Sequence, residues 1–469
     1  MKRSLDASTL ESESKIARFT EPSGCIHGAD QASTSSDRIP SSKKPILNDG
    51  VYFVAINGLK DDPQPERTIS LFELINKIDP IASIHFNYCI DPGFVLSQYP
   101  RRCRSAPITL IVGENSRKLV SQACSSFTNV TVGGASIPFT YCTHHSKLSI
   151  FESEDAIHVM ISTANLIEED YGLKTQAFYY CRAIFFTGDE SARPSKFQGD
   201  LLEYLERAYS KSSPSHDLVS YWISRIKQAD FGHIKDRIVA SVPGRYTSGL
   251  INHFGHMKLR KLLSEKFTAG ELDSLKSHIG QFSSIGSLGS LPQAWLCDEF
   301  LSSLSGKKGL INPKFLKLVY PTVENVRNSL EGWSAGNSLP YSSQTNTKQP
   351  YLKNFLHEWK SENLKRTRAM PHVKSYTSLD SNNEPQWMLL TSANLSHSAW
   401  GKLEKCRTQL FCRSYELGVL LCLKDHPELT ANGLTLPFDV PLSKYGTDDQ
   451  PFLVDVPYAK PDSMGRMRR

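Results

Sequence analysis

The sequence lacks the cysteine patterns of zinc-binding and redox-active proteins. Its 469 residues include ten cysteines, but no pair has the two-residue spacing of a zinc knuckle or a redox site. It also lacks a signal-peptide-like run near the N-terminus and the roughly 20 consecutive apolar residues that cross a bilayer. We therefore expect reduced, mostly buried thiols in a soluble intracellular protein that does not bind membranes.

A strong charge of either sign is missing as well. The net charge is +6 and the pI about 8.6, a mild basic excess that suits a phosphate-rich partner without requiring one. The 39% hydrophobic and 10% aromatic content is ordinary for globular proteins, and the length suffices for two domains with large cores. Charge alone does not select nucleic acid as the partner.

The chain divides into a polar tail and a longer region of alternating patterns. Residues 1–46 are rich in Ser, Thr, Lys and Glu, which predicts a disordered N-terminal tail. From Val51 onward, short apolar runs such as VYFVAI alternate with helical stretches such as LFELINKI. This alternation predicts an α/β fold.

The two halves of this region contain the same elements in the same order. The first half has THHSK, IHVMI and STANLI in succession, and the second has MPHVK, WMLL and TSANLS. His145 and His372 are 227 residues apart, and Asn165 and Asn394 are 229 apart. A duplicated domain explains this repeat, and we predict domains over residues 47–232 and 233–469.

His-x-Lys triplets carry the first indication of chemistry, but only in combination. Composition alone predicts about one or two His-x-Lys/Arg triplets by chance, and the chain has four. Those at His233 and His256 are not followed by an apolar strand and an Asn, so we interpret them as chance matches. Those at His145 and His372 have an Asn 18 and 20 residues after their Lys.

Strand geometry explains why these residue types recur together. In an extended segment residues i and i+2 point to the same side, so His and Lys project together, and a neighbouring strand can place Asn beside them. A single His and Lys on a strand usually lie at the surface or have ordinary hydrogen-bond partners. Core packing, however, does not explain why His, Lys and Asn recur in the same order in both halves. Two facing half-sites would form a phosphoryl-transfer site without a metal or cofactor.

These motifs resemble the phospholipase D superfamily and, within it, the tyrosyl-DNA phosphodiesterases. The resemblance covers about Val51 to Met464 and includes FNYC (86–89), GQFSSIGSLG (280–289), AGNSLPYS (335–342) and SYELGVL (414–420). It implies two similar phospholipase D-like α/β/α sandwich domains that form a pseudo-twofold monomer. The superfamily pattern has an Asp five residues after the Lys, where this chain has Glu152 and Leu379. The tyrosyl-DNA branch lacks that Asp, so we expect Glu152 to be a solvated loop residue.

The resemblance also implies roles for individual residues. It makes His145 the nucleophile that forms a phosphohistidine and His372 the general acid and later base. The phosphate-binding groups that it implies are Lys147, Lys374, Asn165 and Asn394. Gln176 and Glu416 match the pair that orients the two histidines. Gln409 also follows a Thr and is the alternative to Glu416, but the SYELG match favours Glu416.

Further residues match contacts on the two sides of the phosphorus. The DNA-side residues implied by the resemblance are Tyr141, which would stack on a base, and Ser283, Ser284, Ser287 and Ser396. The alternatives are a core tyrosine and ordinary turn serines. Facing the tyrosine or peptide, the resemblance places Tyr88, Ser338 and Pro340.

Together these expectations describe an enzyme that needs no cofactor. It would remove tyrosine or a topoisomerase I peptide from single- or double-stranded DNA 3′ ends, leaving a 3′-phosphate. The family implies nuclear residence, with the cytoplasm as a second location. The alternatives are a phospholipase D-type lipase or general nuclease that uses the same histidines, and a DNA-end-binding protein without turnover.

Overall fold

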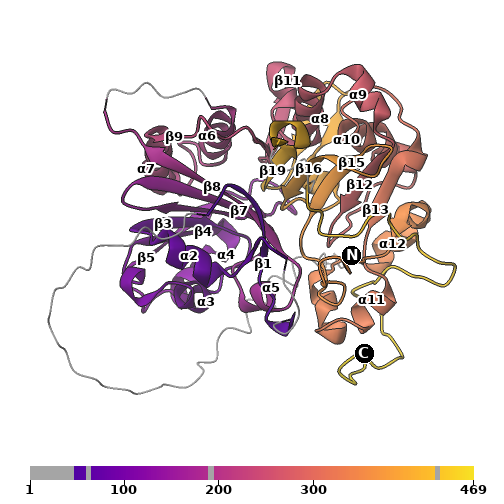
Figure 1. Cartoon of the computed structure of the whole chain (residues 1–469), viewed down its shortest axis with the longest axis horizontal. Helices are drawn as coiled ribbons and strands as arrows, with labels where there is room; N and C mark the ends of the chain where they lie inside the picture. The colour runs from indigo at the N-terminus through magenta and orange to yellow at the C-terminus, as the bar shows by residue number, and fades with distance from the viewer. Residues whose placement is uncertain (1–46, 60–64, 189–194, 428–433, 469) are drawn as a thin grey trace.

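The computed structural model describes residues 47–59, 65–188, 195–427 and 434–468. Figure 1 shows two halves side by side, each built around one sheet, with the N-terminal half in indigo to magenta. The tail predicted for residues 1–46 lies outside the described residues. Within the described ranges, no helix combines the length and apolar character that a bilayer span requires.

The first sheet has nine strands in the order β2-β1-β8-β7-β6-β3-β4-β5, and β9 pairs with β8. The strands are β1 (Gly50–Val54), β2 (Thr68–Ile69), β3 (Ala82–Phe86), β4 (Ile108–Gly113), β5 (Val130–Ala135), β6 (Leu148–Glu152), β7 (Ala156–Ser162), β8 (Ala177–Phe185) and β9 (Ala229–Asp230). All seven residues of β7 are buried, because helices cover the sheet on both faces. One face carries α2 (Leu71–Ile78), α3 (Pro92–Ser97) and α4 (Glu114–Ala123), and the other carries α6 (Lys196–Ala208) and α7 (His216–Lys227).

The second half contains a seven-stranded sheet and a small three-stranded sheet. The larger sheet, in the order β10-β19-β16-β15-β12-β13-β14, consists of β10 (Arg237–Ser241), β12 (Ser277–Gln281), β13 (Leu316–Val319), β14 (Leu356–His357), β15 (Ser375–Leu379), β16 (Pro385–Thr391) and β19 (Glu416–Cys422). The smaller sheet consists of β11 (Gly244–Thr247), β18 (Gln409–Cys412) and β17 (Lys402–Glu404). The helices are α8 (Gly255–Lys266), α9 (Ala269–Ser274), α10 (Ser302–Leu304), α11 (Val323–Arg327), α12 (Ser343–Lys348) and α13 (His397–Trp400).

The two large sheets have the same strand order and the same strand directions. Strands β1, β8, β7, β6, β3, β4 and β5 correspond in that order to β10, β19, β16, β15, β12, β13 and β14. In both sheets the first four pairings are antiparallel and the last two are parallel. The repeat predicted from the sequence is therefore a repeat of the whole sheet plan. The predicted boundary at residue 233 falls between β9 and β10 and stays a prediction.

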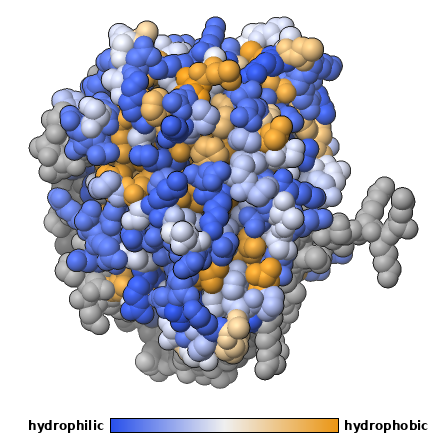
Figure 2. All heavy atoms as spheres, turned by 90° about the vertical axis from the view of Figure 1, so that its right-hand side faces the viewer, coloured by the Kyte–Doolittle hydropathy of each residue, from blue (hydrophilic) through white to orange (hydrophobic). Residues whose placement is uncertain are grey.

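The halves share one hydrophobic core rather than packing as two separate units. A single buried cluster includes Leu201 of α6, Trp222 of α7, Leu259 of α8 and Trp387 of β16. The outer face of the C-terminal half is mostly hydrophilic, with hydrophobic residues in small separate groups (Figure 2). The apolar side chains of α6 to α8 thus hold the two sheets in a fixed relative position.

Candidate active site

The two His-x-Lys motifs of the repeat lie in corresponding places of the two sheets. Lys147 directly precedes β6, and Lys374 directly precedes β15, so each His-x-Lys lies in the extended segment leading into its strand. Asn165 and Asn394 each lie three residues after the neighbouring strand, β7 or β16. The strand predicted to carry His and Lys thus begins just after them.

Backbone hydrogen bonds join each motif to the other half of the molecule. The His145 N–H donates to the Tyr415 carbonyl at 3.1 Å, and the Tyr415 N–H donates to Thr143 at 2.9 Å. On the other side, the His372 N–H donates to the Thr175 carbonyl at 3.0 Å. Each motif therefore pairs with the residue that precedes the orienting side chain of the opposite half, Glu416 or Gln176.

Two adjacent histidines occur in the first motif, and the structure distinguishes them. The buried His144 ring lies between the Asn87 carbonyl, 3.1 Å from Nδ1, and the Tyr209 hydroxyl, 2.6 Å from Nε2. Burial lowers its pKa to about 4. Both ring nitrogens of His144 are engaged by protein groups, whereas the His145 side chain is 14% exposed. His145 is the one that can meet a ligand.

The His145 ring is held by a carboxylate. Its Nδ1 lies 2.9 and 3.1 Å from the two carboxylate oxygens of Glu416, which also accepts a hydrogen bond from the Ser392 hydroxyl. Burial favours a neutral Glu416, but His145, Ser392 and Lys147 outweigh it and lower the carboxyl pKa. An ionised Glu416 accepts the Nδ1 proton, which leaves the Nε2 lone pair available. Burial lowers the pKa of His145 despite this carboxylate, so the ring is neutral near pH 7.

The His372 ring has a different set of partners. Its Nδ1 lies 2.8 Å from the Gln176 amide nitrogen and 3.2 Å from a carboxylate oxygen of Asp170. The Gln176 amide oxygen accepts the Thr163 hydroxyl hydrogen at 2.8 Å, which fixes the amide. Burial lowers the pKa of His372 to about 3, and Asp170 works in the opposite direction. An amide and a carboxylate therefore meet at one ring nitrogen.

Asp170 was not among the residues predicted for the site. It belongs to α5 (Glu168–Gly172), is 2% exposed, and accepts the Asn165 N–H at 2.7 Å. Burial raises its pKa, but the net effect of His372, Lys174 and Asn165 is to lower it, so it is a carboxylate. The repeat gives no signal for it, because the position five residues after Asn394 is Ala399.

The two lysines are buried within their own motifs. Lys147 Nζ donates to the His145 carbonyl at 2.9 Å, and Lys374 Nζ donates to the His372 carbonyl at 2.5 Å. Their exposed fractions are 1% and 0%. The two ammonium groups balance the Glu416 and Asp170 carboxylates at the Nδ1 atoms of the two histidines, and they are the cations of the site that a phosphate anion can pair with.

The two asparagines are held differently. The Asn394 side-chain oxygen accepts hydrogen bonds from the Ser283 N–H at 3.2 Å, the Ser283 hydroxyl at 3.3 Å and the Ser284 N–H at 3.0 Å. These contacts direct its NH₂ group away from the turn. The Asn165 side-chain oxygen is buried without a hydrogen-bond partner in the part of the chain that is described. The predicted DNA-side serines 283 and 284 thus position Asn394.

The remaining predicted contact residues surround this centre. Tyr141 is 52% exposed with a left-handed φ of 61°, so it is not the core tyrosine of the alternative interpretation. Ser287 is exposed, and the Ser396 hydroxyl caps α13 by accepting the Ala399 N–H at 3.1 Å. On the other side, the Tyr88 ring centre lies 5.4 Å from that of His145.

The peptide-side loop connects to the DNA-side turn. Ser338 ends a short 3-10 helix (Gly332–Ser338), and both Ser338 and Pro340 are half-buried. The Ser284 hydroxyl donates to the Pro340 carbonyl at 3.0 Å. One hydrogen bond therefore links the loops predicted to face the two sides of the substrate.

Two further expectations concern Glu152 and Gln409. The prediction of a solvated Glu152 is wrong: this last residue of β6 is 4% exposed and accepts hydrogen bonds from Arg225 and Tyr221. It pairs with α7 because α7 covers that face of the sheet. Gln409 lies in β18, and the side chain that holds the His145 ring is that of Glu416.

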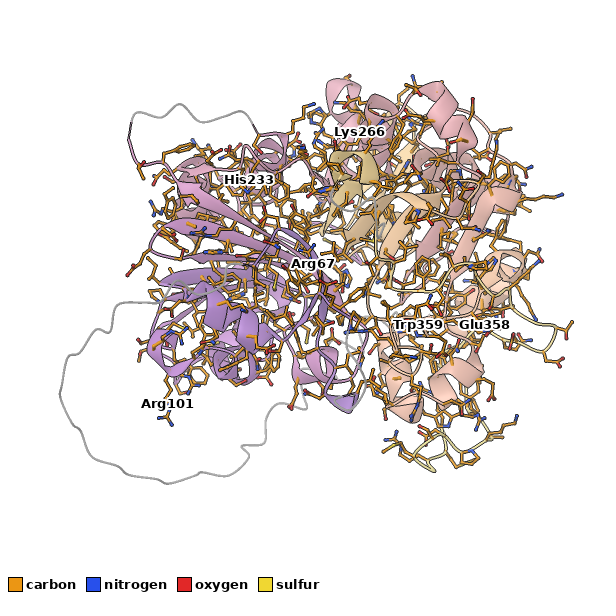
Figure 3. The ribbon with its side chains drawn as sticks, in the orientation of Figure 1. Arg67, Arg101, His233, Lys266, Glu358 and Trp359 are labelled. Atoms are coloured by element: carbon orange, nitrogen blue, oxygen red, sulfur yellow. The ribbon has the colours of Figure 1, made fainter. Side chains whose placement is uncertain are left out.

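The two chance His-x-Lys matches lie among other partners. His233, labelled at the top of the N-terminal half in Figure 3, is 3.0 Å from Asp49. His256 is fully buried in α8 with Nδ1 2.8 Å from the Ser303 hydroxyl. Their partners named here, Asp49 and Ser303, differ from Glu416, Gln176 and Asp170, which hold the rings of His145 and His372.

Comparisons with known proteins agree with this arrangement. The sequence model of the family described as tyrosyl-DNA phosphodiesterase matches residues 50–446. The chain belongs to the tyrosyl-DNA phosphodiesterase family. It is 38% identical to a probable tyrosyl-DNA phosphodiesterase of Caenorhabditis elegans over 426 residues, covering 88% of this chain and 91% of the relative. It is 35% identical to tyrosyl-DNA phosphodiesterase 1 of Drosophila melanogaster, covering 86% and 73%.

Solved structures show the same fold. The crystal structure of yeast tyrosyl-DNA phosphodiesterase superposes with a TM-score of 0.67 at 21% identity, covering 86% of this chain and 100% of that one. The predicted family and the predicted phospholipase D-like fold are thereby confirmed, and membership makes this chain a phosphodiesterase.

Proposed function

We propose that this protein is a DNA-repair enzyme that hydrolyses the link between a DNA 3′-phosphate and a tyrosine, or a topoisomerase I peptide, through a covalent phosphohistidine. The observation that carries the proposal is the pair of histidines with unequal partners, His145 with Glu416 and His372 with Gln176 and Asp170. A reaction in two steps needs one group that stays a nucleophile and one that exchanges a proton.

In the first step, the neutral His145 attacks phosphorus through Nε2. The bond between phosphorus and the tyrosine oxygen breaks, and His372 gives its proton to that oxygen. Lys147, Lys374 and the amides of Asn165 and Asn394 hold the non-bridging oxygens as charge develops on them. The product is a phosphohistidine with the DNA and a free tyrosine hydroxyl.

In the second step, His372 is neutral and accepts a proton from water. The resulting hydroxide attacks phosphorus, the bond to His145 breaks, and the DNA leaves with a 3′-phosphate. Asp170 supports this exchange because a carboxylate at Nδ1 stabilises the imidazolium form. A bound phosphodiester anion acts in the same direction, so His372 gains its proton as substrate binds.

The decisive experiment compares three substrates with the same enzyme preparation. A 3′-phosphotyrosyl oligonucleotide should be converted to a 3′-phosphate, whereas phosphatidylcholine vesicles and unblocked duplex should remain intact. Including EDTA tests whether the two lysines suffice for charge stabilisation, and we expect no loss of rate. Cleavage of the vesicles would favour a lipase, internal cuts in the duplex a general nuclease, and binding without turnover a DNA-end-binding protein.

We further propose that the enzyme acts as a monomer in the nucleus, with the cytoplasm as a second location. Both half-sites come from a single chain, which supports activity without a partner subunit. DNA ends as the substrate support nuclear residence. Sedimentation of the purified protein and imaging of a tagged full-length chain test these two statements.

A further inference from the structure

The small sheet β11-β18-β17 has one buried and one exposed face. Tyr246, Leu403, Leu410 and Cys412 are buried beneath it. Arg245, Phe411 and Lys402 form a row across its three strands on the exposed side, because Phe411 pairs in register with both Arg245 and Lys402. This sheet has no counterpart in the N-terminal half among the described residues.

Aromatic rings hold the cations of this face in place. The Arg245 guanidinium lies 4.2 Å from the Phe411 ring centre, and that of Arg413 lies 5.5 Å from the same centre. Phe139 meets Phe411 edge to face, with ring centres 5.0 Å apart. The Phe411 ring therefore supports one face of each of these two guanidinium groups, and a planar group held in this way presents its N–H edge to a further partner, which for Arg245 is in part Glu404.

Charge on this face is one-sided. The strands, the turn between β17 and β18, and the next residue contribute five cations: Arg245, Lys402, Lys405, Arg407 and Arg413. The same segments contain one carboxylate, Glu404, which lies 3.6 Å from Arg245. Lys402 and Arg413 form no ion pair with any described residue. Such a face complements a polyanion.

The face is continuous with the candidate site through both DNA-side elements. Arg413 precedes Ser414, whose hydroxyl accepts hydrogen bonds from the Thr143 N–H at 3.2 Å and hydroxyl at 3.0 Å. Phe139 lies two residues before the exposed Tyr141. Lys402 follows α13, the helix capped by Ser396. The small sheet thus adjoins, along the chain, the segments that carry Tyr141 and Ser396.

We propose that this exposed face, with Arg245, Lys402, Phe411 and Arg413, binds the single-stranded DNA leading to the blocked 3′ end, several nucleotides from the scissile phosphate. The inference rests on the proposed function, since it extends the DNA path from that site. Cations contact phosphates, and the aromatic and guanidinium planes accept unpaired bases, a combination typical of single-strand binding.

The first test removes the two cations that lack ion pairs. The Arg413→Gln/Lys402→Gln double variant should bind an unblocked 16-nucleotide strand roughly tenfold more weakly at physiological salt, measured by fluorescence anisotropy. Its plot of log Kd against log salt should lose about 1.4 in slope, or about 0.7 for each phosphate contact. The matched control is Arg101→Gln/Lys118→Gln, two exposed cations of the N-terminal half, with Arg101 labelled in Figure 3. An unchanged slope in the double variant, or an equal loss in the control, would overturn the proposal.

The second test separates stacking from charge. Phe411→Leu keeps an apolar side chain on the sheet but removes the plane, so it should weaken strand binding about threefold to tenfold while leaving the salt slope unchanged. Equal melting temperatures of variant and wild type establish that both are folded. Wild-type affinity in Phe411→Leu would remove the aromatic part of the inference.

A length series relates the face to catalysis. With 3′-phosphotyrosyl strands of 3, 6, 10 and 16 nucleotides, the ratio of KM between the double variant and wild type should grow with length. A ratio that is the same at every length would overturn the placement upstream of the centre. Because anisotropy uses an unblocked strand, it reports on the face even if tyrosyl cleavage fails, so the two proposals fail separately.

Discussion

At the scale of single residues, the two histidines differ in the groups at Nδ1. The Nδ1 of His145 meets the carboxylate of Glu416, whereas that of His372 meets the Gln176 amide as well as the Asp170 carboxylate. Burial lowers the pKa of both rings. The bound substrate therefore has to supply the charge that protonates His372, while His145 is ready as a neutral base.

The first prediction follows from what each step requires of His372. A tyrosine phenolate, with a pKa near 10 for its conjugate acid, can leave with little help, but water must lose a proton as it attacks. His372→Asn should therefore accumulate a DNA adduct on His145 that survives SDS and is labile to acid. His145→Ala should form no adduct and lose about 10⁴-fold or more in kcat/KM. Adducts in the His145 variant alone would reverse the two roles.

The second prediction concerns Asp170 as the positioning group of His372. Asp170→Asn removes the charge that supports the imidazolium, so kcat for a tyrosyl substrate should fall about 10- to 100-fold. In a single turnover, the rate of adduct formation on His145 should fall much less with a 4-nitrophenyl leaving group, which departs without a proton. The control is Glu169→Gln, an exposed carboxylate on the same helix. If adduct formation slows equally with both leaving groups, Asp170 acts on the fold and not on proton transfer.

At the scale of elements, the site is formed by segments at the strand ends of two equivalent sheets. Each half supplies a side chain that orients the histidine of the other half. Motif order and spacing predict the residues before β6 and β15 and those after β7 and β16. The repeat does not predict Asp170, because its counterpart is Ala399, nor the contact of Glu152 with α7, which depends on how a helix packs. The choice of Glu416 over Gln409 depends on the family resemblance, because Gln409 follows a Thr as Gln176 does and the repeat alone could indicate Gln409 instead.

The third prediction concerns the segment that carries Gln176. Lys174, 4% exposed, pairs with Glu331, 8% exposed, at 2.7 Å, which joins the start of β8 to the 3-10 helix of the other half. Lys174→Met leaves a buried carboxylate unpaired and should lower the unfolding free energy by about 3–5 kcal/mol. Adding Glu331→Leu should recover most of that loss, as urea unfolding can measure. Independent, additive losses would show that the pair is not coupled.

At the scale of the whole molecule, the sequence predicts two similar α/β halves but not how they join. The core that runs from Leu201 to Trp387 crosses the link between the halves, and the pairing of β11 with β18 joins segments more than 160 residues apart. Local periodicity carries no information on such contacts, because it reports which side of an element is apolar and not what covers it. The small sheet therefore appears only in the structure.

The last prediction concerns the stability of the fold in acid, which depends on the many buried histidines whose pKa is lowered. Burial lowers the pKa of seven of them to about 3 or 4: His85, His144, His158, His256, His278, His372 and His397. In the folded protein they stay neutral as the pH falls below 6.5, whereas the unfolded chain takes up protons there. The unfolded state is thus favoured increasingly below pH 6.5, and the loss continues until the folded-state pKa values are reached.

The expected loss of unfolding free energy is large compared with the total stability of a typical protein. Each such histidine contributes up to about 1.4 kcal/mol per pH unit, so even three or four of them would remove most of a typical unfolding free energy of about 5–15 kcal/mol by pH 4.5. The carboxylates with lowered pKa values act mainly below pH 5, so the interval from pH 7.5 to 5.5 isolates the histidines. Urea unfolding at half-unit steps gives the slope of unfolding free energy against pH, and hence the number of protons taken up. A slope near zero in that interval would mean that these histidines are protonated in the folded protein, which would also contradict a neutral His372 in the free enzyme.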